Sequence, residues 1–520
     1  MTDEIELKLA LRPGELDRVP HLGLVRGLRA GADRCREFTS TYYDTAELAL
    51  ARNGMALRIR HDGAGYVQTL KVPARADRHG GLQHMREVET RLGASQLAPE
   101  PLEAELQPVL DGEAAIDALR PVFGTRIERR EIPLAVDGTT VELALDTGEV
   151  TSGDAVELLH EAEFELKEGE PAYLYRLARM FTRHLDARLQ ERSKAARGHA
   201  LFTARAPAPY KASKPALTPG MTVGEAFAQH AEANLRQVRG NIEAVLAGTD
   251  PEGVHKLRVG LRRLRALLDA FRHVLDPGRY AWLRGELRWL QQEMGPAREW
   301  DVFITETLTP LRARMNDGAA LAALDAAAQD LRAEAYERAR SALATGRATA
   351  VLLTLEEWLT TGAWRLPGSN AEQQGAASYA RAELDTRWKK LRKLGRKHAR
   401  LDDEDLHRLR IRGKKLRYTG EAFAALFPAK PAQRHIKQVE ALQETLGSLN
   451  DAATAERLLA EAHPRMAESD AGGVRAADAA TAAVRGWLAA QVDRDSWRIG
   501  DAWAALADSP KFWRKKPVKA

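Results

Sequence analysis

The chain has 520 residues, which is too long for one ordinary hydrophobic core, so two or three domains are expected. Its 44% hydrophobic and 29% charged residues, with a mean hydropathy of −0.41, are typical of a globular protein in water. The sequence has no apolar run of about 18 residues and begins with acidic residues, which predicts neither a membrane helix nor a secretion signal. A single cysteine, Cys35, excludes an intramolecular disulfide and favours a cytoplasmic location.

Residues 1–202 contain several predicted strands that carry charged residues on one face. In the first of them, Glu4, Glu6 and Lys8 alternate with apolar residues, and residues 161–167 repeat this pattern with three glutamates and a lysine. Side chains alternate between the two faces of a strand, so each set shares one side. For one strand, the ordinary interpretation is a polar face in water. The recurrence favours a closed barrel whose charges line its lumen, with apolar residues packed outward against helices.

Basic residues occur in neighbouring predicted strands. Arg58 and Arg60 share one strand face, and a glycine-containing turn then leads to a strand that ends at Lys71. Helices are expected to fill residues 100–120 and 171–187. Carboxylates hold hard cations such as Mg²⁺, whereas guanidinium and ammonium groups bind phosphate oxygens. The mixture predicts a polyanionic ligand that binds together with divalent cations.

These motifs resemble the CYTH, or triphosphate tunnel metalloenzyme, family over about residues 1–200. The resemblance is carried by the following segments: Glu4 to Lys8, Tyr43-Asp44, Leu57 to Arg60, Gln68 to Lys71, Gly80 to Leu82, Glu87 to Glu89, Asp146 to Gly148, Glu163 to Gly169 and Ser193 to Gly198. It implies an eight-stranded antiparallel tunnel that binds a triphosphate group with Mg²⁺ or Mn²⁺. Family members hydrolyse inorganic or organic triphosphates, and some are adenylate cyclases.

The resemblance also assigns roles to residues of the predicted tunnel. The metal-facing carboxylates it implies are Glu4, Glu6, Glu163 and Glu165. The triphosphate cradle it implies consists of Lys8, Arg58, Arg60, Lys71, Arg129 and Lys194. Glu4, Glu6 and Lys8 are the expected catalytic residues. Arg86 is left out, because Met85 occupies the position in phase with Glu87 and Glu89. Two ordinary alternatives remain, since Lys194 could be a surface lysine and Asp146 could cap a turn before Gly148.

Residues 203–220 are predicted to be an extended linker, because they contain four prolines together with alanine, lysine and serine. The chain from residue 221 to 510 is predicted to be helical, with repeat halves at about 221–365 and 375–510. Two blocks recur at one offset, since 407 − 255 = 152 and 442 − 290 = 152. This constant offset indicates a duplicated helical unit. Residues 511–520 form a basic tail.

Each repeat carries a histidine and three cations at helical spacing. The first set is His255, Arg258, Arg262 and Arg265, and the second is His407, Arg410, Lys414 and Arg417. A single set of this kind is usually a solvated helix face. Like charges stacked on one helix face repel each other, so their recurrence favours a polyanionic partner. Neither histidine has a neighbouring ligand pattern that indicates zinc.

This region resembles the CHAD family, the conserved-histidine α-helical domain, through the two basic blocks and the segments Leu290 to Asp301 and Leu442 to Asp451. The resemblance implies two helical bundles that bind inorganic polyphosphate. A nucleic-acid partner is disfavoured, because Tyr418 is the only aromatic residue beside the basic sets.

Together, the two resemblances predict an α+β protein: an antiparallel β-barrel tunnel with flanking helices, followed by an all-α domain. The predicted function is metal-dependent hydrolysis of tripolyphosphate, coupled to polyphosphate binding, in the cytoplasm or at polyphosphate granules. One alternative is a polyphosphate or granule-binding protein with little turnover. Another is a triphosphatase or cyclase acting on ATP or thiamine triphosphate.

Overall fold

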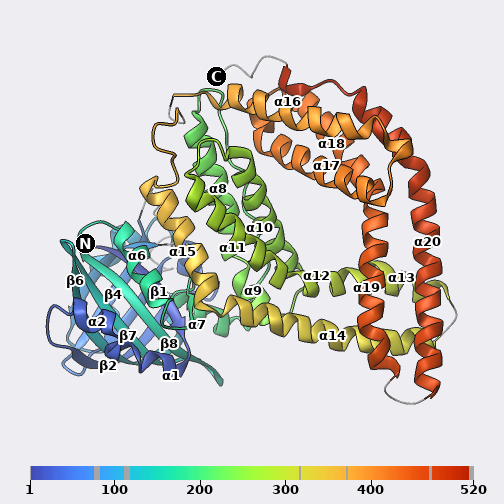
Figure 1. The fold of residues 1–520 in the computed structure, drawn as a ribbon. Helices are drawn as coiled ribbons and strands as arrows, with labels where there is room; N and C mark the ends of the chain where they lie inside the picture. Colours follow the sequence, from blue (N-terminus) through green and yellow to red (C-terminus); the bar gives the residue numbers. More distant parts are fainter. Residues whose placement is uncertain are drawn as a thin grey trace. The chain divides into compact units, whose positions relative to one another are not determined.

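The computed structural model describes residues 2–74, 82–110, 117–315, 318–370, 373–467 and 471–514. The chain forms two compact units (Figure 1). The first unit comprises Met1–Pro207 and Leu343–Ala363, and the second comprises Ala208–Ala342 and Trp364–Ala520. Two predicted features fall partly outside the described residues, namely the Gly80-Gly81 motif and the end of the basic tail from residue 515.

The first unit is built on an antiparallel β-sheet. Its strands are β1 (Thr2–Leu11), β2 (Arg34–Asp44), β3 (Ala56–His61), β4 (Tyr66–Pro73), β5 (Gln83–Leu92), β6 (Arg120–Val136), β7 (Thr139–Ser152), β8 (Ala155–Glu168) and β9 (Ala187–Leu189). The strand order is β5-β4-β3-β2-β6-β7-β8-β1, and β5 also pairs with β1. In the described part of the chain, eight strands therefore close into a ring, with β9 added beside β1. The predicted tunnel is confirmed.

The strand registers define which side chains face the inside of the ring. Lys8 lies opposite Glu163, Glu6 opposite Glu165, and Arg129 opposite Asp146. Side chains at directly paired positions share one face of a sheet. The intervening residues, such as Leu7, Leu9 and Phe164, belong instead to a buried outer core. The charged residues therefore share the inner face, and the apolar residues between them pack outward.

Several helices accompany the ring. They are α1 (Pro13–Leu16), α2 (Gly23–Leu28), α3 (Ala49–Arg52), α4 (Glu103–Leu106), α6 (Ala172–Phe181) and α7 (Lys194–Phe202), with short 3₁₀ turns at Val19–His21 and Glu100–Leu102. The region from 100 to 120 holds only short helical turns where it is described, so a helix filling that stretch is not seen. The helix expected at 171–187 ends at Phe181, because β9 follows.

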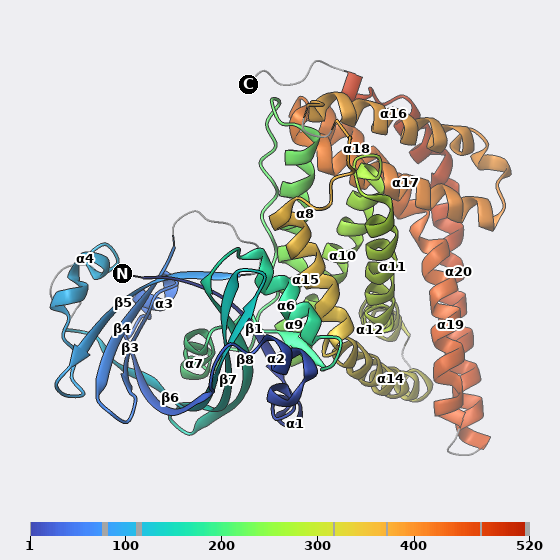
Figure 2. The same cartoon turned by 60° about the vertical axis from the view of Figure 1, so that its left-hand side comes forward.

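Helix α7 lies within the ring of strands (Figure 2). Its Ala195 joins an apolar cluster with Phe38, Tyr42 and Phe123, which project from the inner face of β2 and β6. A Cβ atom at Gly198 would lie 2.1 Å from the Phe123 ring, so only glycine allows this close approach. The lumen is therefore only partly lined by charges, because one part is filled by α7 and its apolar contacts.

A helix from far along the chain also belongs to the first unit. Helix α15 (Gly346–Thr361) packs against α6 and β9, and its Leu353 is fully buried in the outer core of the ring. Arg176 and Arg179 of α6 contact Glu357 at 2.9 and 3.1 Å. The first unit is thus assembled from two segments that are separated by more than a hundred residues.

The second unit is helical. Its helices are α8 (Val223–Arg239), α9 (Ile242–Ala247), α10 (Glu252–Phe271), α11 (Pro277–Glu293), α12 (Gly295–Val302), a π-helix (Phe303–Leu308), α13 (Thr309–Arg314), α14 (Ala319–Leu343), α16 (Ala376–Gly395), α17 (Asp403–Phe423), α18 (Ala429–Thr445), α19 (Gly447–Ala467) and α20 (Ala471–Ala507), with 3₁₀ turns at His398–Arg400, Ala424–Leu426 and Phe512–Arg514. Three pairs of helices begin at the predicted offset: 429 − 277, 447 − 295 and 471 − 319 are each 152. The duplication is therefore present in the fold.

The region predicted as a linker is anchored on the second unit from Ala208 onward. Asn241 is fully buried, and its amide accepts a hydrogen bond from the Tyr210 backbone N–H and donates one to the Tyr210 carbonyl. Leu217 is also buried. The part of this segment between Tyr210 and Leu217 is therefore held at both ends. Among the described helices, none combines the length and apolarity needed to cross a membrane.

Candidate functional site

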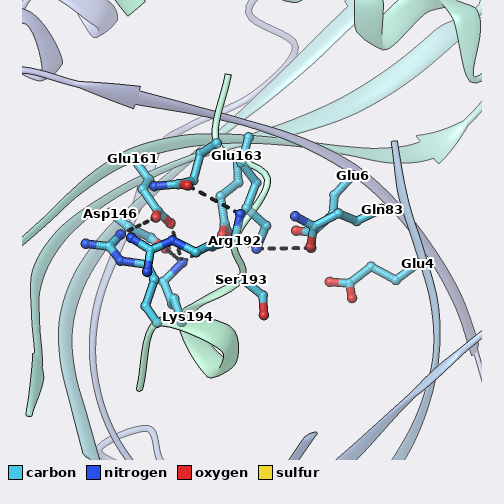
Figure 3. Close-up of polar contacts among 12 residues, drawn as sticks. Glu4, Glu6, Gln83, Asp146, Glu161, Glu163, Arg192, Ser193 and Lys194 are labelled. Carbon is cyan, nitrogen blue, oxygen red and sulfur yellow. Dashed lines mark hydrogen bonds and ion pairs between the residues drawn. The ribbon is translucent and has the colours of Figure 1, made fainter. Parts of the chain in front are cut away.

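A dense group of charges occupies the inner face of β1, β7 and β8 (Figure 3). Its centre is Glu163, which accepts hydrogen bonds from Lys8 at 2.6 Å, Lys194 at 2.7 Å and Arg129 at 2.5 Å. Burial opposes the charge of Glu163, but these three cations hold its pKa well below the ordinary value. Glu163 is therefore ionised and tightly compensated.

Lys194, the first residue of α7, brings three carboxylates together. Its ammonium group lies 2.7 Å from Asp146, 3.1 Å from Glu161 and 2.7 Å from Glu163. Oxygen atoms of the three acids lie within 4.8 Å of one another, which is a spacing that could hold a metal ion. The lysine ammonium already contacts all three. This cluster consequently has a cation of its own, and it fits a metal poorly while Lys194 is in place.

A second group of carboxylates extends along β1 and β8. Glu4 accepts from Lys71 at 2.5 Å, and Lys71 also contacts Glu87 at 2.6 Å. Burial opposes ionisation of Glu4, but Lys71 lowers its pKa to about 2. Glu4 is therefore an anion with a fixed partner.

Glu6 and Glu165 differ from Glu4, because the pKa of each is raised, chiefly by burial. Glu6 contacts Lys8 at 3.0 Å, but the charges of Glu163 and Glu4 also raise its pKa. Carboxylates whose charge is incompletely compensated are suited to a hard divalent cation. Glu6 is therefore the acid of this row best suited to such an ion, since Glu4 and Glu165 each accept from a lysine at 2.5 Å, Lys71 and Lys167 respectively.

Two arginines on β3 face the inner apolar cluster without a carboxylate partner among the described residues. Arg58 donates to the Tyr42 hydroxyl at 3.5 Å, and Arg60 lies 4.6 Å from the centre of the Phe38 ring. Burial, together with Arg58 and Arg129, lowers the pKa of Arg60 to about 9. The Nε atoms of both arginines are buried and lack a hydrogen-bond partner in the described part of the chain. These guanidinium groups are available to an anion.

Arg86, which was excluded from the predicted site, lies on the opposite face of β5. The register pairs Met85 with Glu4, and Arg86 approaches Glu105 at 3.5 Å.

The two ordinary alternatives considered for Asp146 and Lys194 are both wrong. Asp146 does not cap a turn, because it is buried in β7 and bound by Arg129 at 2.6 Å. Lys194 is not a surface lysine, because it is buried.

The residues of the second unit that are predicted to bind polyphosphate lie on α10 and α17, which pack against each other. Arg262 and Arg417 lie 5.2 and 5.1 Å from the centre of the Tyr418 ring. Burial, Arg410, Arg262 and Arg417 lower the pKa of Lys414 to about 8. One cluster is thus formed by Arg262, Arg410, Lys414 and Arg417.

The other four residues predicted to bind polyphosphate lie outside this cluster. Arg258 and Arg265 donate to the backbone carbonyl and the side chain of Gln291, each within 2.8 Å. The pKa of half-buried His255 is lowered by burial and by Arg298, whereas His407 is exposed. The structure therefore brings half of the predicted basic set into one group.

Family comparisons agree with this two-part architecture. The sequence matches the CYTH domain model over residues 2–199 and the CHAD domain model over residues 229–460. The chain belongs to the CYTH and CHAD families.

A curated relative and two solved structures resemble parts of this CYTH-CHAD chain. The inorganic triphosphatase of Haemophilus influenzae is 28% identical over 212 residues, which are 39% of this chain and 55% of that relative, so the match spans about half of its length. The CHAD domain of the plant Ricinus communis is 33% identical, with a TM-score of 0.49, and covers 58% of this chain and 99% of its own. The Hippeastrum adenylyl cyclase candidate HpAC1, described with a dominant triphosphatase activity, is 21% identical, with a TM-score of 0.29, over 39% of this chain and 96% of its own.

The ten residues predicted for the tunnel all lie toward the inside of the CYTH ring. Strand register places some of them there, and the others contact residues of the inner face. Sequence reasoning assigned no site role to Asp146, Glu161, Glu87, Arg197 or Tyr42. Glu161 and Glu87 share the alternating pattern of their assigned neighbours, so the pattern itself could have identified them. Arg197, which donates to Glu161 at 2.6 Å, could not be found this way, because its position depends on α7 entering the ring. Which of these residues bind ligand remains a prediction.

Proposed function

We propose that the CYTH domain hydrolyses inorganic tripolyphosphate with Mg²⁺ or Mn²⁺ and that the CHAD domain binds inorganic polyphosphate. The observation that carries the first part is that one ring places two kinds of group on its inner face: Arg58 and Arg60, which have no carboxylate partner among the described residues, and the incompletely compensated carboxylate Glu6. Such a lumen offers guanidinium groups that can bind phosphate oxygens and a carboxylate that can bind a divalent cation.

A divalent cation held by Glu4, Glu6 and Glu165 would supply neutralisation and polarisation of the phosphate oxygens. The protein's own cations do the remaining work. Arg58 and Arg60 bind and orient the triphosphate, because their Nε donors are buried and have no hydrogen-bond partner among the described residues. Lys8, Arg129 and Lys194 stabilise the negative charge that the leaving diphosphate acquires as the P–O anhydride bond breaks. Water forms the new bond to phosphorus, and its proton passes to the phosphate products or to solvent.

The second part rests on the cluster of Arg262, Arg410, Lys414 and Arg417. Arg417 is paired with Glu421 and Glu440, but Arg262, Arg410 and Lys414 form no ion pair in the described part of the chain. Cations this close together cost free energy unless an anion accompanies them, and burial together with this repulsion lowers the pKa of Lys414. A linear chain of phosphates supplies repeated charge without requiring base recognition. The proposal also includes a cytoplasmic location with recruitment to polyphosphate granules, which polyphosphate affinity would support.

The decisive experiment is a substrate panel. Phosphate release would be measured from tripolyphosphate, ATP and thiamine triphosphate, with Mg²⁺, Mn²⁺ or chelator. Tripolyphosphate is expected to give the highest kcat/KM, and chelator is expected to abolish turnover. Preference for ATP or thiamine triphosphate would replace the proposed substrate, and absence of turnover would favour the binding-only alternative.

A matched pair of variants tests the site itself. Arg60→Gln removes an inward-facing guanidinium, whereas Arg126→Gln removes an exposed arginine from the outer face of the same sheet, where it is out of phase with Arg129. We expect the first to lower kcat/KM by roughly a hundredfold, in line with the loss of a charge-assisted contact. The second should be neutral. Polyphosphate binding by the full chain should survive Arg60→Gln and weaken in the Lys414→Gln variant.

A further inference from the structure

A cavity of about 960 Å³ opens in the helical second unit. Its walls come from α8, α10, α17 and α18, and residues Ala212–Pro215 of the anchored linker form another side. Ligand-binding cavities in proteins commonly have volumes of about 300–1,000 Å³. The space is therefore large enough for a small organic molecule.

The cavity lies on a different face of α10 from the predicted polyphosphate residues. Arg263, Ala266 and Ala270 line it, whereas Arg258, Arg262 and Arg265 do not. Residues one position apart on a helix differ in direction by about 100°, so the two sets face different neighbours. Tyr418 stands between them, because its ring contacts Arg262 and also lines the cavity.

The cavity wall is mainly apolar. The side chains that make this wall include Ala233, Ala266, Leu267, Ala422, Phe427 and Ile436. The small side chains of alanine leave the space that bulkier residues would fill. Such a wall suits a hydrocarbon chain and offers little to inorganic phosphate.

Cations outnumber free anions at the edge of this apolar space. Arg263, Arg434 and Lys437 line the cavity, and none of them forms an ion pair with a described residue. The two acids of the lining, Glu421 and Glu440, contact Arg417 at 3.3 and 3.0 Å. The net charge that remains at the rim is therefore positive, which selects an anionic head group.

We propose that this cavity binds an amphipathic anion, with a hydrocarbon chain on the alanine-rich wall and a carboxylate or phosphate head beside Arg263. The segment between Tyr210 and Leu217 forms one side of the site, because it is anchored at both ends by Asn241 and by burial of Leu217. The residues lining this site include none of those proposed to bind triphosphate or polyphosphate.

Calorimetric titration of the full chain tests the proposal. Decanoate and decyl phosphate, below their micelle concentrations, are expected to bind with one-to-one stoichiometry. Butyrate lacks the chain and decan-1-ol lacks the charge, so each should bind at least roughly tenfold more weakly. Equal binding of butyrate and decanoate would overturn the role of the apolar wall. Equal binding of decan-1-ol would overturn the role of the cations.

Variants locate the binding site. Arg263→Gln should weaken decanoate binding by roughly tenfold or more, whereas Lys389→Gln, an exposed lysine on α16, should not change it. Ala266→Trp fills the cavity and should abolish binding. Ala425→Trp, at an exposed lining position, provides the same test with less risk to folding. The proposal would be refuted if the folded Ala425→Trp variant and the Arg263→Gln variant both bound decanoate with the affinity of the parent protein. Multiple binding events in every variant would also refute it, because they would indicate general surfactant binding.

Discussion

The Glu6 carboxylate lies 3.0 Å from the Lys8 ammonium group, and both side chains are buried in the ring. This contact does not compensate the charge of Glu6, because burial and the neighbouring acids Glu163 and Glu4 raise its pKa. Lys8 is shared with Glu163, which lies closer, at 2.6 Å. A positive charge added beside Glu6 is therefore expected to stabilise the fold.

Glu6→Gln should separate metal dependence from stability. A folded-state pKa above the unfolded value makes a stability contribution that is present at low pH and lost as pH rises. At pH 7 without metal, the variant is expected to be as stable as the parent or more stable. Hydrolysis with Mg²⁺ should be abolished, and so should the rise in Tm that Mg²⁺ gives the parent protein. Thermal unfolding with and without Mg²⁺ measures both effects.

Glu163→Gln is the matched comparison on the neighbouring strand. It removes the carboxylate that Lys8, Arg129 and Lys194 share, so the unfolding free energy of the first unit should fall by about 3–5 kcal/mol. A loss of stability in Glu6→Gln as large as in Glu163→Gln would contradict the assignment of Glu6 to a divalent cation.

Tyr42→Phe should reveal whether the phenol contacts the substrate. Tyr42 is stacked on Phe123 with ring centres 4.4 Å apart, and its hydroxyl accepts from Arg58 at 3.5 Å. Phenylalanine keeps the stacking and removes the hydroxyl, so the fold should be unchanged. We expect KM for tripolyphosphate to rise roughly five- to thirtyfold, as for the loss of a hydrogen bond of about 1–2 kcal/mol. Unchanged steady-state kinetics would show that the hydroxyl only orients Arg58 or has no role.

The inner face of the ring could be predicted because strand alternation is a local property. Glu4, Glu6 and Lys8 share a face in any extended backbone, so their inward direction required only the closure of the ring. The partners within that face could not be predicted in the same way. Glu163 meets Lys194 only because α7 enters the lumen, and that entry depends on Gly198 passing the Phe123 ring.

In the helical region, too, only part of the arrangement could be predicted from the sequence. The repeat offset is visible in the sequence, because duplicated residues remain similar wherever they lie in the fold. The position of α15 is not visible, since its residues fall within the stretch matched by the CHAD model yet pack on the ring. Leu353 looks like any core leucine of a helical bundle, and only the tertiary contact with β-strand residues shows where it is buried.

Polyphosphate affinity should depend on pH through Lys414. Its pKa in the free protein is lowered to about 8 by burial and neighbouring arginines, so its positive charge is present below that pH and lost above it. A bound polyanion favours the charged form, and affinity is therefore expected to decline as pH rises from about 7 to 9. Titration calorimetry with Lys414→Gln should give weaker binding at pH 7 and a flatter pH profile. A profile as steep as that of the parent would assign the pH dependence to another group.

Helix α15 should be required for the stability of the CYTH ring. Leu353 is fully buried in the outer core of the ring, on a helix that packs against α6 and β9, so Leu353→Ala is expected to cost about 2–5 kcal/mol. A Cβ atom at Gly346 would lie 2.3 Å from the Thr182 carbonyl oxygen, so Gly346→Ala should also displace the helix. Thr360→Ala, at an exposed position of the same helix, is the control. Hydrogen exchange of the full chain should become faster in β1 and α6 for the first two variants and stay unchanged in α10. Because two units can unfold separately, this local measurement is preferable to one global transition. Parent-like protection of β1 and α6 in Leu353→Ala and Gly346→Ala would show that the ring is stable without α15.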